Sequence, residues 1–169
     1  MAKDIAILAE DDYEDLELWY PLLRLREEGF NVTVIGVDCD VYYSKHGYEV
    51  VADVAIDEVD PEKYEGVIVP GGWAPDRLRR YPAVNDFVRK LFDNGKLVAS
   101  ICHGGSVLIS AGILRGKRAT AVMAIKDDMI NAGARFIDTE VICDGNLITS
   151  RTPADLPAFM REIIKALKK

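Results

Sequence analysis

The sequence predicts an α/β fold built on a doubly wound, mainly parallel sheet with helices on both faces. Short apolar runs typical of buried strands alternate along the chain with segments of helical periodicity. Where such a run ends, acidic, glycine or cysteine residues follow directly, as expected at the carboxyl edge of a parallel sheet. With 169 residues the chain is long enough for a substantial core, so we expect a single domain over residues 1–169.

The chain opens with a strand, a helix and a second strand. Residues 4–9 are largely apolar, and 31–37 are rich in β-branched side chains, which suits buried strands. Between them, 14–28 places its apolar side chains at helical spacing and ends before Gly29. Pro21 lies inside this segment and is expected to kink the helix.

The next part of the chain combines a small excursion with a third main strand. Segments 41–43 and 48–56 predict a minor antiparallel pair. Residues 66–69 read as a buried strand that ends in a proline and two glycines. Two helices are then expected, over 76–80 and 82–94.

A cysteine at a strand-to-helix turn is the most informative stretch of the sequence. Residues 97–101 predict a central strand, and 106–111 predict a buried helix, with Cys102 between them. This arrangement is a nucleophile elbow, whose sharp turn needs small neighbours such as Gly104 and Gly105. The helix start is expected to favour the thiolate of Cys102, with a pKa below the ordinary range, although an inert buried cysteine is the alternative.

The last third of the chain predicts edge structure and a closing helix. A short strand over 117–122 and a helix over 126–131 precede 140–143 and 147–150, a pair that flanks an Asp-Gly-Asn turn and predicts a hairpin. The final helix is expected to start at Pro153.

Other residues near the predicted sheet edge could serve the cysteine. His103 is a candidate base or, alternatively, a packing histidine, whereas His46 is expected to pack a turn. Asp76 and Glu14 are candidate acids, each of which could instead be an ordinary helix-start acid. The Gly71-Gly72 pair would let backbone N–H groups form an oxyanion hole, or it could be only a tight turn.

Composition excludes several classes of partner. The net charge is −7 without a dense basic run, which argues against nucleic acid and anionic membranes. No apolar run is long enough to span a bilayer, and the start of the sequence shows no signal peptide. Cys39, Cys102 and Cys143 are odd in number and widely spaced, which indicates a reducing cytoplasm rather than disulfides. No metal-binding motif occurs, so neither a metal nor a cofactor is expected.

Several of these motifs together resemble the PfpI-type intracellular proteases of the class I glutamine amidotransferase-like superfamily. The matching stretches are YED at 13–15, KHG at 45–47, VPGG at 69–72, ASICHG at 99–104 and DDMINAG at 127–133. The resemblance implies a flavodoxin-like fold with Cys102 as nucleophile, His103 as its partner and Glu14 touching the sulfur. It also implies an oxyanion hole from the backbone of Gly72 and His103, and a third acid, Asp76, donated by a neighbouring subunit of a dimer or hexamer.

The sequence departs from this family at three positions around the predicted site. Close members have glutamate in place of Asp76, arginine in place of Trp73 and an aromatic residue in place of Val122. Trp73 and Val122 are therefore expected to shape the substrate pocket differently.

The expected function is that of a cytoplasmic cysteine-dependent hydrolase of the PfpI protease type. The first alternative is a glyoxalase or protein deglycase, in which the same sulfur attacks methylglyoxal or its adducts. The second alternative is a sensor whose cysteine oxidises under oxidative stress. Short loops around the cysteine favour a small aldehyde substrate over an extended peptide.

Overall fold

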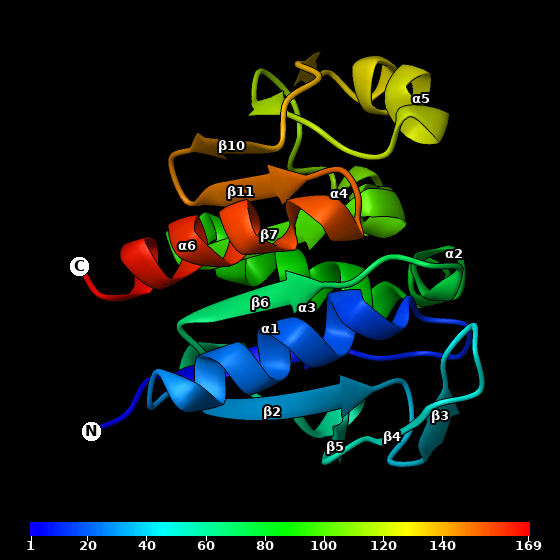
Figure 1. Ribbon diagram of the computed structural model, residues 1–169, viewed down its shortest axis with the longest axis vertical. Helices are drawn as coiled ribbons and strands as arrows, with labels where there is room; N and C mark the ends of the chain where they lie inside the picture. The colour runs from blue at the N-terminus through cyan, green and yellow to red at the C-terminus, as the bar shows by residue number, and fades with distance from the viewer.

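A seven-stranded sheet forms the centre of the computed structural model, which describes residues 1–169. The strand order is β10-β11-β7-β6-β1-β2-β5 (Figure 1). The strands of this sheet are β1 (Asp4–Leu8), β2 (Asn31–Gly36), β5 (Val54–Ala55), β6 (Gly66–Val69), β7 (Leu97–Ile101), β10 (Val141–Asp144) and β11 (Leu147–Ser150). All neighbouring strands are parallel except the β10–β11 hairpin, which confirms the mainly parallel, doubly wound sheet.

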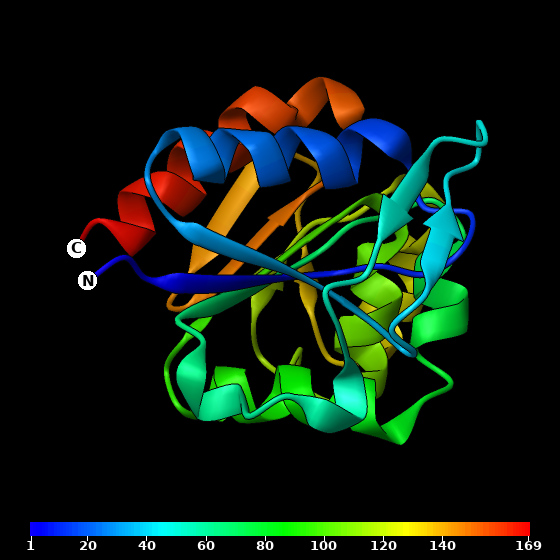
Figure 2. The same ribbon diagram turned by 90° about the horizontal axis from the view of Figure 1, so that it is seen from below.

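Helices cover both faces of the sheet (Figure 2). One face packs against α1 (Asp15–Glu27) and α6 (Leu156–Leu167), and the other against α3 (Pro82–Asp93) and α4 (Gly105–Ala111). Side chains of β1 alternate between the two cores, with Ile5 and Ile7 on the α1 side and Ala6 and Leu8 on the α3 side. The remaining helices, α2 (Ala74–Leu78) and α5 (Lys126–Asn131), lie toward the carboxyl edge (Figure 1). No helix has the length and apolar character needed to cross a membrane.

The structure differs from the expected elements in three places. The segment 48–56 divides, because β4 (Glu49–Val51) pairs with β3 (Val41–Tyr43) while β5 returns to the main sheet. Only Arg118–Ala119 of 117–122 forms a strand, β8, and its partner β9 (Arg135–Phe136) was not expected. The helix α6 begins at Leu156, after a 3-10 turn at Pro153–Asp155, and not at Pro153 as expected.

The elbow between β7 and α4 has the expected sharp geometry. The strand ends at Ile101, and Cys102–Gly104 form a 3-10 turn that leads into α4. Cys102 has φ +59°, a left-handed conformation that costs energy in a residue with a Cβ. A Cβ on Gly104 would lie 2.4 Å from the carbonyl oxygen of Val69, so this turn can approach β6 only with glycine there.

The loops that follow β1, β6 and β7 meet at the carboxyl edge of the sheet, as the parallel topology requires. Tyr13, after β1, forms isolated bridges both to Gly72, after β6, and to Ser44 at the tip of the β3–β4 hairpin. Three separate segments are thereby fixed around the elbow.

The close approach of Gly104 to β6 leads to a stability prediction. We expect Gly104→Ala to lower the free energy of unfolding by about 1–3 kcal/mol, since a backbone oxygen cannot move aside. Gly105→Ala is the matched control, because its Cβ would meet only the side chains of Met129 and Ile125. Urea unfolding of the two variants measures the difference, and equal stabilities would contradict the steric role of Gly104.

Candidate active site

Two backbone N–H groups are directed at the sulfur of Cys102. They belong to His103, the next residue in the elbow, and to Gly72 in the turn after β6. Gly72 has φ +77°, and a Cβ there would lie 2.4 Å from the carbonyl oxygen of Asp12. Only glycine therefore allows the turn to bring its N–H to the sulfur.

A buried carboxyl group lies against the same sulfur. Glu17, in the first turn of α1, is 0% exposed, and its Oε2 accepts a hydrogen bond of 2.7 Å from the Gly71 N–H. Its carboxyl also acts on the pKa of Cys102, and Oε1 has no hydrogen-bond partner. A Cβ on Gly71 would lie 2.4 Å from Glu17 Oε2 and 2.7 Å from the Cys102 Cβ. The missing side chain of Gly71 is what lets the two groups meet.

Burial raises the pKa of both members of this pair. It raises the pKa of Glu17 to about 7, against the opposing effect of the Gly71 N–H. Burial and the adjacent carboxylate raise the pKa of Cys102 to about 12, against the two N–H groups that favour the thiolate. The pair therefore keeps at least one proton at neutral pH.

The expectation of a low pKa for Cys102 is therefore wrong. That expectation considered only the helix start, which does favour the thiolate. The structure adds burial and the Glu17 carboxylate, and both favour the thiol. Because the thiol can pass its proton directly to Glu17 during attack, a free thiolate is not needed beforehand.

The glutamate at the sulfur is Glu17. The sequence had instead predicted Glu14 at this place. Glu14 is the N-cap residue of α1, and its Oε2 lies 3.1 Å from Nζ of Lys45. Glu17 lies almost one turn further along and faces inward together with Leu18 and Pro21. An acid on the apolar face of a helix was the signal that could have identified it.

His103 is placed to exchange protons with the sulfur. Its Nδ1 lies 3.4 Å from Cys102 Sγ. Burial, followed by the charge of Lys45, lowers the pKa of His103 and so favours the neutral imidazole at pH 7. The Trp73 ring lies beside the imidazole, with centroids 5.3 Å apart and planes inclined by 42°.

Other expected site residues lie around the elbow with different degrees of contact. Val122 donates its N–H to the Cys102 carbonyl at 3.4 Å, and Trp73 is 59% exposed beside His103. Asp76, in α2, forms an exposed ion pair of 2.5 Å with Arg80. No hydrogen bond within the chain joins Asp76 to His103.

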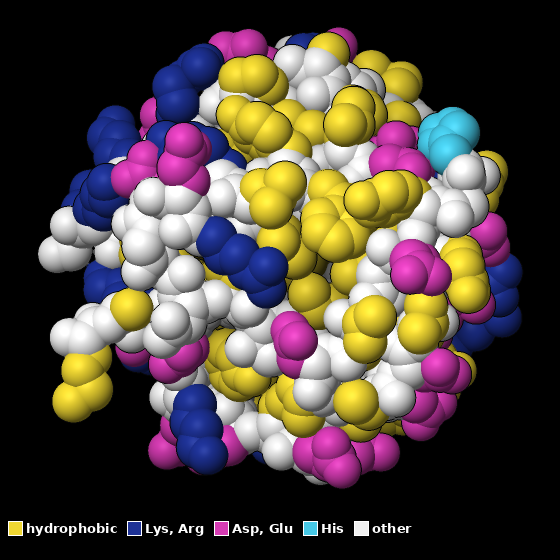
Figure 3. Space-filling model, turned by 60° about the horizontal axis from the view of Figure 1, so that its bottom comes forward, with side chains coloured by type: hydrophobic (Ala, Val, Ile, Leu, Met, Phe, Trp, Pro, Cys, Tyr) yellow, Lys and Arg dark blue, Asp and Glu magenta, His cyan; other side chains and the backbone are white.

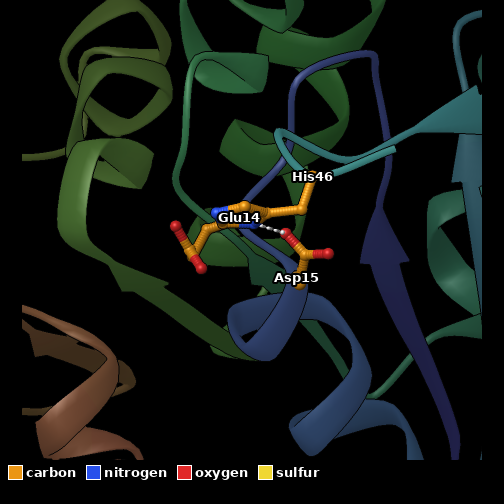
Figure 4. A group of neighbouring side chains, drawn as sticks. All are labelled: Glu14, Asp15 and His46. Atoms are coloured by element: carbon orange, nitrogen blue, oxygen red, sulfur yellow. Dashed lines mark hydrogen bonds and ion pairs between the residues drawn. The ribbon is translucent and has the colours of Figure 1, made fainter. Parts of the chain in front are cut away.

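One group of side chains near the site could in principle hold a metal ion. Ligand atoms of Glu14, Asp15 and His46 lie within 4.8 Å of one another. Figure 4 shows His46 bonded to Asp15, at 2.7 Å, with the Glu14 carboxylate turned away from that pair. Glu14 is engaged by Lys45, and Asp15 also accepts a hydrogen bond from Ser44. The ligand atoms of these three residues already have protein partners. His46 does not pack the turn as expected, because its side chain is 71% exposed and is bonded to Asp15.

The buried Glu17 predicts a pH-dependent difference in stability between the parent protein and Glu17→Gln. The pKa is raised from 4.5 to about 7 in the folded protein, so the stability contributed by Glu17 is complete below pH 4.5. It is lost as the pH rises through 7, which amounts to about 3 kcal/mol at most. We therefore expect Glu17→Gln to be more stable than the parent at pH 8 and similar to it at pH 4.

Thermal unfolding at the two pH values measures this difference. Glu14→Gln serves as the control for removing a charge from the same end of α1. A Glu17→Gln advantage that is the same at pH 4 and pH 8 would contradict the assignment of a buried, proton-holding carboxyl.

Solved structures and known sequences agree on the family of this fold and site. The DJ-1/PfpI-like part of a two-domain protein from Anabaena variabilis, which also has a ferritin-like domain, matches with a TM-score of 0.97 and 43% identity, covering 98% of this chain and 48% of that one. Drosophila melanogaster DJ-1beta matches with a TM-score of 0.91 and 28% identity, covering 99% and 91% of the two chains.

Two curated relatives carry names that describe cysteine or carbonyl chemistry. A Pyrococcus abyssi protein named a deglycase is 50% identical over 164 residues, covering 97% of this chain and 99% of that protein. YraA of Bacillus subtilis, which has a cysteine-protease name, is 41% identical over 169 residues, covering 99% and 100%. Since the DJ-1/PfpI family model also matches residues 3–166, this chain belongs to the DJ-1/PfpI family.

Proposed function

We propose that this protein is a cysteine-dependent enzyme that converts small 2-oxoaldehydes, or releases them from amino groups, as a glyoxalase or deglycase does. The observation that carries the proposal is Glu17, a fully buried carboxyl with a pKa of about 7 beside Cys102. A group of this kind exchanges protons efficiently near neutral pH. The deglycase name of the Pyrococcus abyssi relative supports the same chemistry.

The first step forms a bond between sulfur and the aldehyde carbon. As the sulfur of Cys102 attacks, its proton passes to Glu17, and the electron pair of the carbonyl bond moves onto oxygen. The N–H groups of Gly72 and His103 stabilise that oxygen, and protonation then gives a hemithioacetal. Glu17 needs an uncommitted oxygen to carry the proton, and Oε1 is unpartnered.

The second stage moves a proton between neighbouring carbons. The hydrogen on the sulfur-bearing carbon is removed as a proton and returned to the adjacent carbon, which converts the hemithioacetal into a thioester of a 2-hydroxy acid. Water hydrolyses the thioester and restores the thiol, so the net reaction is addition of one water molecule without an oxidant. With a glycated amine as substrate, the amine is the leaving group and takes up the proton that Glu17 received from the thiol.

Peptide hydrolysis is the second candidate function. The pair of N–H groups at Cys102 also suits the tetrahedral intermediate of acyl transfer, and the name of YraA points to a protease. This reaction needs His103 to be oriented by an acid, which within one chain is not present. A role as an oxidation sensor is less well supported, since the raised pKa of Cys102 keeps the sulfur protonated.

Self-association is part of the proposal. Hydrophobic side chains gather on the face that carries α1 and the β3–β4 hairpin (Figure 3), among them Leu16, Leu23, Tyr48 and Val51. A groove of about 450 Å³ runs between α1 and β4 beside this patch. A second copy of the chain would cover such a surface, and Asp76, which is exposed and paired with Arg80, would act as the acid for a neighbour's His103.

We also place the enzyme in the cytoplasm. Cys39 and Cys143 are exposed and unpaired, which suits a reducing compartment.

Substrate class can be tested by comparing specificity constants. We expect kcat/KM for methylglyoxal to exceed that for a short fluorogenic peptide, and to fall about a thousandfold in Cys102→Ser. Glu17→Gln should lower kcat for methylglyoxal by about a hundredfold, because the amide cannot accept the thiol proton. Peptide cleavage that dominates in the parent protein and disappears in Cys102→Ser would establish the protease instead.

A shared active site can be tested by mixing inactive subunits. We expect Cys102→Ala and Asp76→Ala proteins to regain part of the parent activity when mixed, since a mixed assembly contains one complete site. Subunit exchange is confirmed by native mass spectrometry with one variant isotopically labelled. Exchange without recovered activity would show that Asp76 does not complete a neighbour's site.

A further inference from the structure

Trp73 is a large apolar side chain that takes no part in either hydrophobic core. The other tryptophan, Trp19, packs on the core beneath α1, lies edge-on to Tyr48 and donates its indole N–H to the Tyr13 hydroxyl at 3.1 Å. Trp73 belongs to neither core and is 59% exposed. Packing of the fold therefore does not account for a tryptophan at this position.

The cap of the adjoining helix does not account for Trp73 either. It is the N-cap residue of α2, where a short polar side chain would accept a backbone N–H, but the indole makes no such bond. Its backbone is fixed, because its N–H donates to the Asp12 carbonyl at 2.8 Å and its carbonyl accepts the Asp76 N–H at 3.1 Å. The indole is thus held in place by a rigid turn and serves neither the core nor the cap.

The fixed indole lies beside the reactive groups of the site. Its ring centroid is 5.3 Å from that of His103, whose Nδ1 lies 3.4 Å from the Cys102 sulfur. The turn that carries the indole is also pressed against the elbow. A Cβ on Gly71 would lie 2.7 Å from the Cys102 Cβ and 3.1 Å from the backbone nitrogen of His103. A carbonyl compound that reacts with this sulfur therefore has its substituent within reach of the indole.

An exposed aromatic ring at this place favours one class of substituent. Aromatic rings attract one another in offset or edge-to-face arrangements, with centroids about 4.5–7 Å apart. The indole and the His103 imidazole already form such a pair, with planes inclined by 42°, and much of the indole remains exposed for a third ring. A phenyl ring buries far more apolar area against the indole than a methyl group does, so the indole discriminates between the two.

We propose that Trp73 is a specificity-determining residue that packs against an aromatic ring of the substrate, so that the enzyme prefers aryl 2-oxoaldehydes such as phenylglyoxal to methylglyoxal. The proposal rests on the proposed function and names the substituent next to the reacting aldehyde. The chemistry at Cys102 is the same for both compounds, because the sulfur attacks the aldehyde carbon while the aryl ring is attached to the neighbouring ketone carbon.

The first measurement uses covalent labelling and needs no turnover. In a Cys39→Ser/Cys143→Ser background, Cys102 is alkylated by phenacyl bromide or by bromoacetone, which differ in the same phenyl-for-methyl exchange. In both reactions the sulfur displaces bromide and its proton passes to solvent, and intact-mass spectrometry gives the rate. We expect Trp73→Ala to lower the ratio of the phenacyl bromide rate to the bromoacetone rate by about fivefold, and Trp73→Phe to retain the ratio.

Tyr81→Ala is the matched control for this measurement. Tyr81 is likewise an exposed aromatic N-cap residue, that of α3, and its side chain makes no cap bond. Trp73→Leu keeps an apolar side chain without an aromatic face, so it should lower the ratio as alanine does, and it decides the result if Trp73→Ala does not fold. An unchanged ratio in the folded variants, or an equal fall in Tyr81→Ala, would overturn the proposal. An unchanged ratio together with loss of the assembly would show that Trp73 is a subunit contact instead.

The second measurement relates the aromatic contact to turnover. We expect kcat/KM for phenylglyoxal, relative to that for methylglyoxal, to fall by about fivefold in Trp73→Ala. A parent protein that turns over neither aldehyde but shows the expected change in labelling would refute the proposed function and leave the role of Trp73 intact. Turnover of both aldehydes with a selectivity that Trp73→Ala does not alter would uphold the proposed function and overturn the role of Trp73.

Discussion

The contact between the Glu17 carboxyl and the Cys102 sulfur is the constraint on which the rest of the site depends. Two groups that both lose protons are buried together, and neither has a cation in direct contact. Ionising both would place two negative charges side by side away from water, which is strongly unfavourable. The pair therefore keeps at least one proton at neutral pH, and this proton is available for transfer to a carbonyl substrate.

Three segments from distant parts of the sequence create that contact. The first turn of α1 supplies Glu17, the elbow after β7 supplies Cys102, and the turn after β6 supplies Gly71 and Gly72. The parallel sheet brings the ends of these strands to one edge, but it does not fix the distance between the carboxyl and the sulfur. That distance depends on Gly71, because any side chain there would separate the carboxyl from the sulfur.

Much of the fold was predictable because its signals are local and strong. Buried strands such as Gly66–Val69 and Leu97–Ile101 are short apolar runs with clear ends, and the elbow follows from the order strand, cysteine, glycines, helix. Two-residue strands such as β8 and β9 were beyond this approach, because pairs of that length have no periodicity. The separation of β4 from β5 depends on which neighbour each strand finds in three dimensions.

The site was predictable in its nucleophile and less so in its electrostatics. Glu14 and Glu17 differ by three positions, and the place of Glu17 on the apolar face of α1 was the one sequence signal that separates them. The ion pair between Lys45 and Glu14 was likewise invisible, because it forms where a hairpin tip folds back onto a loop about thirty residues earlier in the sequence. Charges that act across space have no sequence period to reveal them.

The strained backbone of Cys102 links the stability of the elbow to its chemistry. A left-handed φ of +59° at a residue with a Cβ stores strain of about 1–2 kcal/mol, which glycine would release. Replacement of Cys102 by glycine would thus relieve the backbone strain and remove the nucleophile. The left-handed turn at Cys102 is therefore a cost in stability that the elbow bears for the sake of the reaction.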